Sequence, residues 1–270
     1  MYFVESGRRD GPTLVCVPGL LGGAENFNGM LAELEATFHV VRLDPNAERR
    51  LSDLTSEVMR ELSYTSTADA VAEVLDRVGR PQAYLVGLSL GGKIVYDFAI
   101  KFPGRFRGAV ITDVGPGPFE DSELYRFVDG LVTNAPLHLP WPEMREHLRN
   151  TIADRNLRSL IQSQIAYPGQ KPPAIWKTGM KDFGEMLNRQ RIGHQFDGLE
   201  RVDAELVARG VQFRVLQSSS CSGISASSLP KIAELKSMHL RPVANSSHFL
   251  HITHKDLIVQ ELLAMLMPGT

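Results

Sequence analysis

A serine in a glycine-framed turn is the residue whose surroundings point most directly to chemistry. Ser89 lies at the centre of Gly87-Leu88-Ser89-Leu90-Gly91, between an apolar run and an amphipathic one. This G-x-S-x-G pattern between a strand and a helix predicts a sharp turn that lifts the serine hydroxyl above a sheet. Glycines are needed because side chains two positions from the serine would collide in so tight a turn. The alternative is a crowded turn that small residues merely fill.

A serine hydroxyl is a weak nucleophile and needs a base beside it. His248, in VANSSHFLHITHKDL, follows the last predicted strand, where a loop histidine can reach the serine. His251 and His254 follow at three-residue steps, and such a cluster could hold a metal. The spacing HxxHxxH lacks the i, i+4 pair of a helical zinc site, so we expect no metal. His39 and His239 lie inside strand patterns and are expected to be structural.

The negatively charged oxygen formed during attack by a serine needs two backbone donors. The amide of Leu90, directly after the serine, is the first expected donor. The second is expected from the loop PGLLGG (residues 18–23), where glycines let the backbone approach a ligand, and Leu20 is the predicted donor. Alone this loop would be an ordinary glycine-rich turn, but together with the turn around Ser89 it favours a functional role.

Short apolar runs that alternate with helix-like segments must position these residues. Six β-branched-rich runs predict buried parallel strands, at residues 13–19, 39–44, 83–87, 108–113, 212–217 and 238–243. Residues 68–79 predict an amphipathic helix that Ser66 and Thr67 could cap and that Gly79 would end. Strands that alternate with helices indicate an α/β doubly wound, mostly parallel sheet with helices on both faces.

The interval from about Gly115 to Gly210 breaks this alternation, because it contains helix-like stretches separated by prolines and no convincing strand. A helical insertion in an α/β sheet predicts a cap over a pocket. We expect residues 1–115 and 210–270 to form the core and residues 116–209 the cap; a second independent domain is the alternative. The apolar side chains of the cap predict a substrate with an apolar or aromatic group, and they include Phe127, Leu131, Leu137, Trp141, Trp176, Phe183 and Met186.

Composition limits the partners of the protein. Of its 270 residues, 43% are hydrophobic and 22% charged, and the net charge is −2; these values are ordinary for a globular protein and disfavour a nucleic-acid partner. Two distant cysteines, Cys16 and Cys221, predict neither a disulfide framework nor a metal site. No apolar run approaches the length of a membrane span, and the first residues lack a signal-peptide pattern. We expect a soluble cytoplasmic protein that acts on a small molecule, while its oligomeric state stays open.

Together these stretches resemble the α/β-hydrolase fold family, specifically its lidded serine esterase and lipase-like members. The resemblance covers nearly the whole chain: PGLLGG for the oxyanion loop, GLSLGG for the nucleophile, VITDVGP after the strand that the family counts as its sixth, a helical cap, and SSHFLH for the histidine loop. It implies a Ser–His–acid hydrolase that needs no cofactor, with the cap inserted after the sixth strand.

The acid departs from the family pattern. In most relatives an aspartate follows the strand that QFRVLQ (residues 212–217) represents, but this chain reads SSSCSGIS there, without a carboxylate. Some relatives carry the acid after the preceding strand, where this chain has Asp113. A structural aspartate that binds turn amides is the alternative. We predict a Ser89–His248–Asp113 triad that cleaves a small ester, thioester or lactone. A carbon–carbon bond hydrolase, or a non-catalytic ligand-binding or signalling protein of the same fold, are the rival predictions.

Overall fold

A single seven-stranded sheet forms the centre of the protein, in the order β1-β3-β2-β4-β5-β8-β9. The computed structural model describes residues 1–19, 22–44, 64–118, 123–176, 195–220 and 222–267. Within this sheet, as far as the structure describes the chain, β1 alone runs antiparallel to its neighbour, β3. The strands are β1 (Phe3–Gly7), β2 (Thr13–Val17), β3 (His39–Leu43), β4 (Ala83–Leu88), β5 (Phe106–Thr112), β8 (Phe213–Ser218) and β9 (Met238–Val243).

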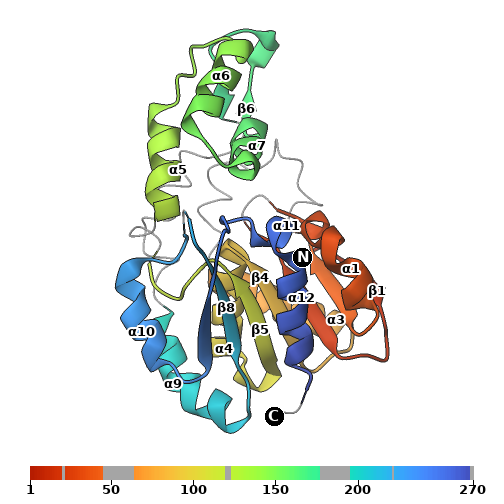
Figure 1. Cartoon of the computed structure of the whole chain (residues 1–270). Helices are drawn as coiled ribbons and strands as arrows, with labels where there is room; N and C mark the ends of the chain where they lie inside the picture. Colours follow the sequence, from red (N-terminus) through yellow and green to blue (C-terminus); the bar gives the residue numbers. More distant parts are fainter. Residues whose placement is uncertain (20–21, 45–63, 119–122, 177–194, 221, 268–270) are drawn as a thin grey trace.

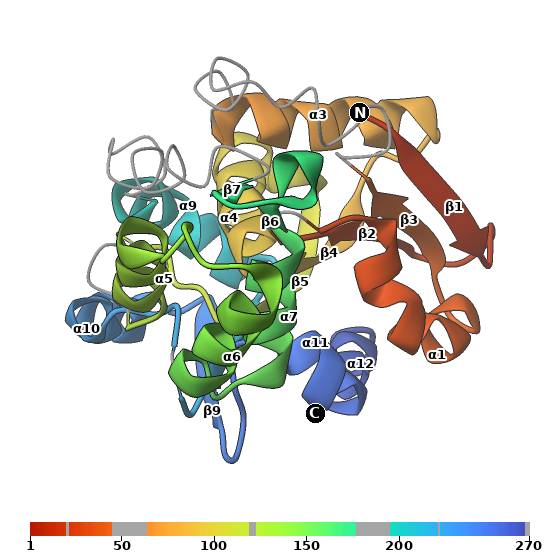
Figure 2. The same cartoon turned by 90° about the horizontal axis from the view of Figure 1, so that it is seen from above.

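Helices cover both faces of the sheet, as Figure 2 shows from above. One face carries α3 (Tyr64–Arg77), α4 (Leu90–Lys101), α9 (Phe196–Ala208) and α10 (Leu229–Glu234). The other carries the 3₁₀ helix η1 (Ala24–Met30), α1 (Leu31–Glu35), α11 (Leu250–Thr253) and α12 (Lys255–Ala264). Single 3₁₀ turns η3 (Pro103–Arg105) and η5 (Ala226–Ser228) complete the core. The predicted doubly wound, mostly parallel α/β fold is confirmed.

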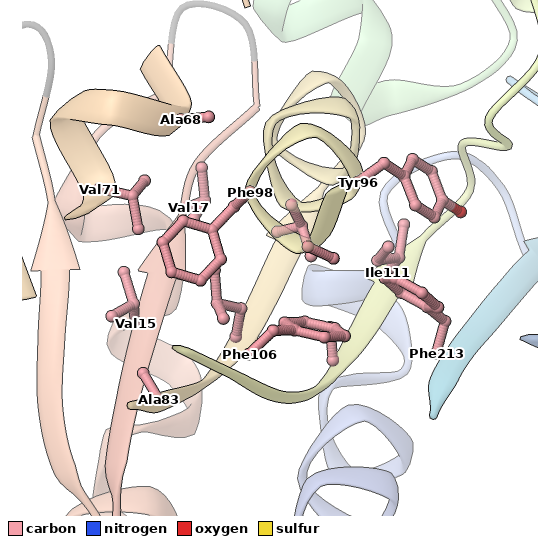
Figure 3. Packing of buried hydrophobic residues seen from close by; sticks show 14 of the residues in the cluster. Val15, Val17, Ala68, Val71, Ala83, Tyr96, Phe98, Phe106, Ile111 and Phe213 are labelled. Atoms are coloured by element: carbon pink, nitrogen blue, oxygen red, sulfur yellow. The ribbon is translucent and has the colours of Figure 1, made fainter. Parts of the chain in front are cut away.

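Alternate residues of each strand supply the two cores. Val15 and Val17 of β2 pack toward α3 and α4, whereas Leu14 and Cys16 pack toward η1 and α12. Because both faces are covered, the strand reads as an unbroken apolar run rather than an alternating one. Figure 3 shows the first of these cores, in which the rings of Phe106 and Phe213 stack with their centroids 4.8 Å apart.

The segment predicted to form a cap leaves the core after β5, the fifth strand of this chain, and lies above the sheet in Figure 1. It contains α5 (Glu123–Asn134), α6 (Trp141–Thr151), α7 (Arg155–Ser163) and the 3₁₀ turn η4 (Pro168–Gln170). Its own apolar cluster is built from Met144, Leu148, Ile152, Leu157, Ile161, Ile165 and Ala174. Within the described ranges, no helix combines the length and hydropathy that crossing a bilayer requires.

Three details differ from the sequence-based expectations. The cap includes a short antiparallel pair, β6 (Ile165–Ala166) with β7 (Ile175–Trp176), which is too brief to leave a periodic signal. Helix α3 begins at Tyr64, so Ser66 and Thr67 lie inside it rather than before its first turn; Gly79, at φ 68°, does follow its end. Helix α9 falls inside the predicted cap interval, yet it packs against the core.

That packing involves the buried side chains of α9. Phe196, Leu199 and Leu206 of α9 are buried in the same cluster as the side chains of α4 and β5. The division into core and cap at residues 115 and 210 stays a prediction, and this contact favours an earlier return to the core.

Candidate active site

Ser89 occupies a strained turn between β4 and α4. Its φ of 49° and ψ of −117° lie in a region that residues other than glycine rarely adopt. The flanking glycines make the turn possible: a Cβ on Gly87 would lie 2.7 Å from the Cα of Gly92, and one on Gly91 would overlap the carbonyl oxygen of Val17. The turn is held at its start, because the Ser89 amide donates to the Thr112 carbonyl of β5 at 3.0 Å.

The structure brings the three predicted residues together in one chain of hydrogen bonds. The Nε2 atom of His248 lies 2.8 Å from the Oγ atom of Ser89. The Nδ1 atom of the same ring lies 2.7 Å from the Oδ2 atom of Asp113. Asp113 is fully buried, while the histidine side chain keeps 12% of its surface exposed. The ring therefore bridges a buried carboxylate and a serine hydroxyl.

The strand order explains how Asp113 reaches the histidine. β5 lies between β4 and β8, and its last residue, Thr112, pairs with Leu88 on one side and Leu216 on the other. Asp113 follows directly, so it stands at the same sheet edge as the serine turn. Its backbone adopts a left-handed φ of 51°, and its amide donates to the Leu216 carbonyl at 2.7 Å.

The loop after β8, which lacks a carboxylate, instead surrounds the carboxylate of Asp113 with donors. Oδ1 accepts from the Ser218 amide at 2.8 Å and from the Ser222 hydroxyl at 2.9 Å. Oδ2 accepts from the Gly223 amide at 3.0 Å in addition to the histidine ring. These four donors hold the carboxylate in one orientation.

The same serine-rich run also holds the histidine loop. The Ser219 hydroxyl donates to the Ser246 carbonyl at 3.0 Å and accepts from the Ser246 amide at 3.0 Å. The Ser220 hydroxyl donates to that carbonyl as well, at 2.9 Å. The sequence analysis missed these positioning residues. The sequence signal that could have indicated them is the run of serines from residue 218, at the place where the resemblance to the family puts the acid.

The predicted oxyanion donors are only partly described. Leu90 is the first residue of α4, and the first amides of a helix have no acceptor within it. Leu20 lies outside the described residues. Gly19, just before it, is close to the serine: a Cβ there would lie 3.5 Å from the Cβ of Ser89. The loop predicted to supply the second donor therefore starts beside Ser89.

The remaining histidines take other positions. Burial, together with the nearby His248, lowers the pKa of His251 to about 4. His254 contacts the Thr253 hydroxyl at 2.9 Å, and His39 contacts Glu5 at 2.9 Å. Among the described residues, no three His, Cys, Asp or Glu side chains group as metal ligands would.

The cap residues named from the sequence divide into three sets. Phe127, Leu131, Leu137 and Trp176 pack against the cap's own cluster. Trp141 is 37% exposed and meets the ring of Tyr167 edge-on. Phe183 and Met186, like Cys221, lie outside the described residues. From the core, Phe249 also packs against the cap cluster, directly after His248 in the chain.

Several known proteins are similar in sequence to this chain. The zebrafish (Danio rerio) sn-1-specific diacylglycerol lipase ABHD11 is 21% identical over 275 residues, which cover 99% of this chain and 82% of the relative. Carboxylesterase YbfK of Bacillus subtilis (strain 168) is 26% identical, with coverages of 81% and 77%. A 2-hydroxy-6-oxo-6-phenylhexa-2,4-dienoate hydrolase of Comamonas testosteroni is 31% identical over 100 residues, 37% of this chain and 33% of the relative.

Solved structures share the fold. A marine microorganism esterase superposes with a TM-score of 0.69 at 18% identity, over 98% of each chain. The sequence pattern of the alpha/beta hydrolase fold matches residues 12–153, which include Ser89 and Asp113. With its sheet order, its glycine-framed serine turn and these matches, the chain belongs to the alpha/beta hydrolase fold family.

Proposed function

We propose that this protein is a serine hydrolase that cleaves a small carboxylic ester, thioester or lactone. The observation that carries the proposal is the continuous hydrogen-bonded relay from the Asp113 carboxylate, at 2.7 Å from the His248 ring, to the Ser89 hydroxyl, at 2.8 Å from that ring. Such a relay activates the serine because the base is within reach of its proton and the acid fixes the tautomer of the base.

In the first half of the proposed reaction, the Ser89 oxygen attacks the substrate carbonyl and His248 Nε2 takes the serine proton. The amides of Leu20 and Leu90 would stabilise the negative charge on the carbonyl oxygen. The imidazolium then gives its proton to the leaving alcohol, thiol or tethered hydroxyl as the carbonyl bond to it breaks. This leaves an acyl group on Ser89.

In the second half, a water molecule attacks the acyl-serine while His248 takes its proton. Collapse of the second tetrahedral intermediate returns the proton to Ser89 and releases the carboxylic acid. Asp113 orients the ring of His248 in both halves and stabilises the imidazolium each time it forms. The net reaction adds one water across the ester bond.

An apolar or aromatic acyl or alcohol group is the proposed substrate feature. The apolar cluster of the cap, which Phe249 joins from the neighbourhood of His248, supports this choice. The names of two relatives, a diacylglycerol lipase and a carboxylesterase, also favour ester substrates.

A fluorophosphonate probe tests the nucleophile, since an activated serine reacts with it rapidly. We expect one probe adduct by intact-protein mass spectrometry, lost in Ser89→Ala and retained in Ser163→Ala, a matched change on cap helix α7. A panel of p-nitrophenyl esters then measures turnover. Equal labelling of wild type and Ser89→Ala would refute the assignment.

Carbon–carbon bond hydrolysis is a second candidate, favoured by the Comamonas testosteroni relative. Turnover of 2-hydroxy-6-oxo-6-phenylhexa-2,4-dienoate with none of the esters would select it. Saturable binding of an ester without probe labelling or turnover would instead select the non-catalytic ligand-binding protein.

A further inference from the structure

A fully buried lysine lies one helical turn after Ser89. Lys93 is on α4, with none of its surface exposed, and lysine is almost never fully buried unless its ammonium is paired. The proposed hydrolysis makes no use of it. The groups that hydrogen-bond to its ammonium therefore indicate the role of the buried charge.

Those partners lie in the two segments that join the cap to the core, called the stems below: residues 114–118, which leave the core, and residues 195–199, which return to it. The Lys93 ammonium donates to the carbonyl of Gly117, in the loop that leaves the core after β5, and to the Oε1 atom of Gln195 at 3.3 Å, in the chain that returns to the core. The stems also bond to each other, because the Gln195 amide donates to the Pro116 carbonyl at 3.1 Å. Figure 1 shows this departure after β5 and this return at α9.

A partly buried carboxylate, Asp97, lies one turn beyond Lys93 on α4. The side-chain amide of Gln195 and the charge of Lys93 both lower its pKa. The orientation of that amide follows from its neighbours, since an ammonium only donates and an ionised carboxylate only accepts. Burial outweighs both effects and raises the pKa of Asp97 to about 6.

Helix α4 also forms a second hydrogen bond to the segment that follows Asp113. The Tyr96 hydroxyl donates to the carbonyl of Val114, the residue after Asp113, at 3.1 Å. Helix α4, which begins at the nucleophile, is thus bonded at Val114 and at Gly117 to the segment that runs from Asp113 into the cap.

We propose that Lys93 is a positioning residue for the cap. Its buried ammonium connects both stems to α4, the helix that begins after the nucleophile, through the two hydrogen bonds to Gly117 and Gln195, which are called the tie below. The tie sets the position of the cap over the site. The tie acts on the binding of substrates large enough to touch the cap, and leaves the chemical step to the triad. Its kinetic consequence rests on the proposed ester hydrolysis, but the tie itself does not.

Hydrogen exchange tests the tie without any substrate. In Lys93→Met we expect amide exchange in residues 114–118 and 195–199 to rise about tenfold, the size expected for the loss of one charge-assisted hydrogen bond. Exchange in β4 should be unchanged. Lys101→Met is the matched control, because Lys101 lies on the same helix but pairs with Asp69 at the surface. Wild-type exchange at both stems in Lys93→Met would overturn the proposal.

Steady-state kinetics tests the expected effect on substrate binding. For a long-chain p-nitrophenyl ester we expect KM to rise about tenfold with kcat nearly unchanged, and for the acetate ester we expect little change in either. Equal effects on both esters would overturn a role through the cap. If no ester is hydrolysed at all, the proposed function fails while the exchange measurement still decides the tie.

A double variant separates the tie from simple charge pairing. Lys93→Met leaves Asp97 without its partner charge and could reduce folding, whereas Lys93→Met/Asp97→Asn removes both charges. We expect the double variant to regain thermal stability but to keep the faster stem exchange and the raised KM. Recovery of exchange and KM along with stability would show that Lys93 only balances charge, and would overturn the proposal.

Discussion

Replacement of Asp113 by asparagine tests the least usual part of the proposed triad. The carboxylate accepts four hydrogen bonds, two on each oxygen, from Ser218, Ser222, Gly223 and His248. An asparagine offers one oxygen and one NH₂ group, which only donates. Whichever way the amide turns, its NH₂ group faces a backbone N–H, either that of Ser218 or that of Gly223.

The two orientations have different consequences for the base. With NH₂ toward His248, the ring must accept at Nδ1 and carry its proton on Nε2, where it cannot take the serine proton. With oxygen toward His248 the tautomer is right, but the charge that stabilises the imidazolium is gone. Acid-to-amide changes in triads suggest a loss in kcat of roughly 10³- to 10⁴-fold, which corresponds to about 4 to 5.5 kcal/mol.

The assay is ester turnover in Asp113→Asn, with thermal unfolding followed by circular dichroism. Asp203→Asn is the matched control, since Asp203 also accepts hydrogen bonds from backbone amides, at Lys236 and Ser237, but lies on α9. Its kcat should stay near the wild-type value. A folded Asp113→Asn with a near wild-type rate would refute the triad and leave Ser89 and His248 acting as a dyad.

Three further predictions test other parts of the molecule. Ser89→Ala and His248→Ala should each remove most ester turnover, and the double variant should lose little more, because the residues act as a unit; additive losses would contradict His248 as the base. Trp176→Ala should change the ranking of acyl chain lengths in turnover while probe labelling persists, whereas the exposed Trp141→Ala should not; the same ranking in both would place Trp176 in the cap's internal packing alone. Burial raises the pKa of Asp97 from 3.8 to about 6, so the folded state binds its proton more tightly and stability falls as pH rises through this window. Asp97→Asn should therefore gain unfolding free energy relative to wild type as the pH rises from about 4 to about 6, by at most about 3 kcal/mol, measured by urea unfolding, and a pH-independent difference would contradict this.

Local signals in the sequence were sufficient for the six parallel strands, though not for β1, and for choosing the three residues that the structure brings together. The central strands β2 and β4 are buried on both faces, so their apolar runs are continuous, and the serine turn needs glycines at fixed offsets. Asp113 could be named because it ends a strand next to the one that leads to Ser89. Each of these inferences uses residues within one short segment or the order of neighbouring segments.

Contacts between distant segments could not be read in the same way. The donors to Asp113 come from a loop more than a hundred residues later, Ser218 being 105 positions away. No periodicity in residues 196–208 distinguishes a helix of the core from one of the cap, so the packing of α9 on α4 appears only in three dimensions. Lys93 likewise looks like an ordinary polar position of an amphipathic helix until both cap stems surround it.

The serine-rich loop predicts opposite effects of one substitution in two backgrounds. Ser222 places its hydroxyl 2.9 Å from the Asp113 carboxylate, so an aspartate at position 222 would bring a second negative charge to the first. In the wild type, Ser222→Asp should lower kcat, because two adjacent carboxylates disfavour ionisation of one another and the loop loses a donor. In Asp113→Asn the same change supplies the missing charge at the place where most relatives carry it, and it should recover part of the lost kcat, about tenfold or more. The four rates, measured on one ester, form a double-mutant cycle in which the effect of Ser222→Asp changes sign. An effect of the same sign in both backgrounds would mean that a carboxylate at position 222 does not reach His248, and that the loop after β8 serves only to hold Asp113.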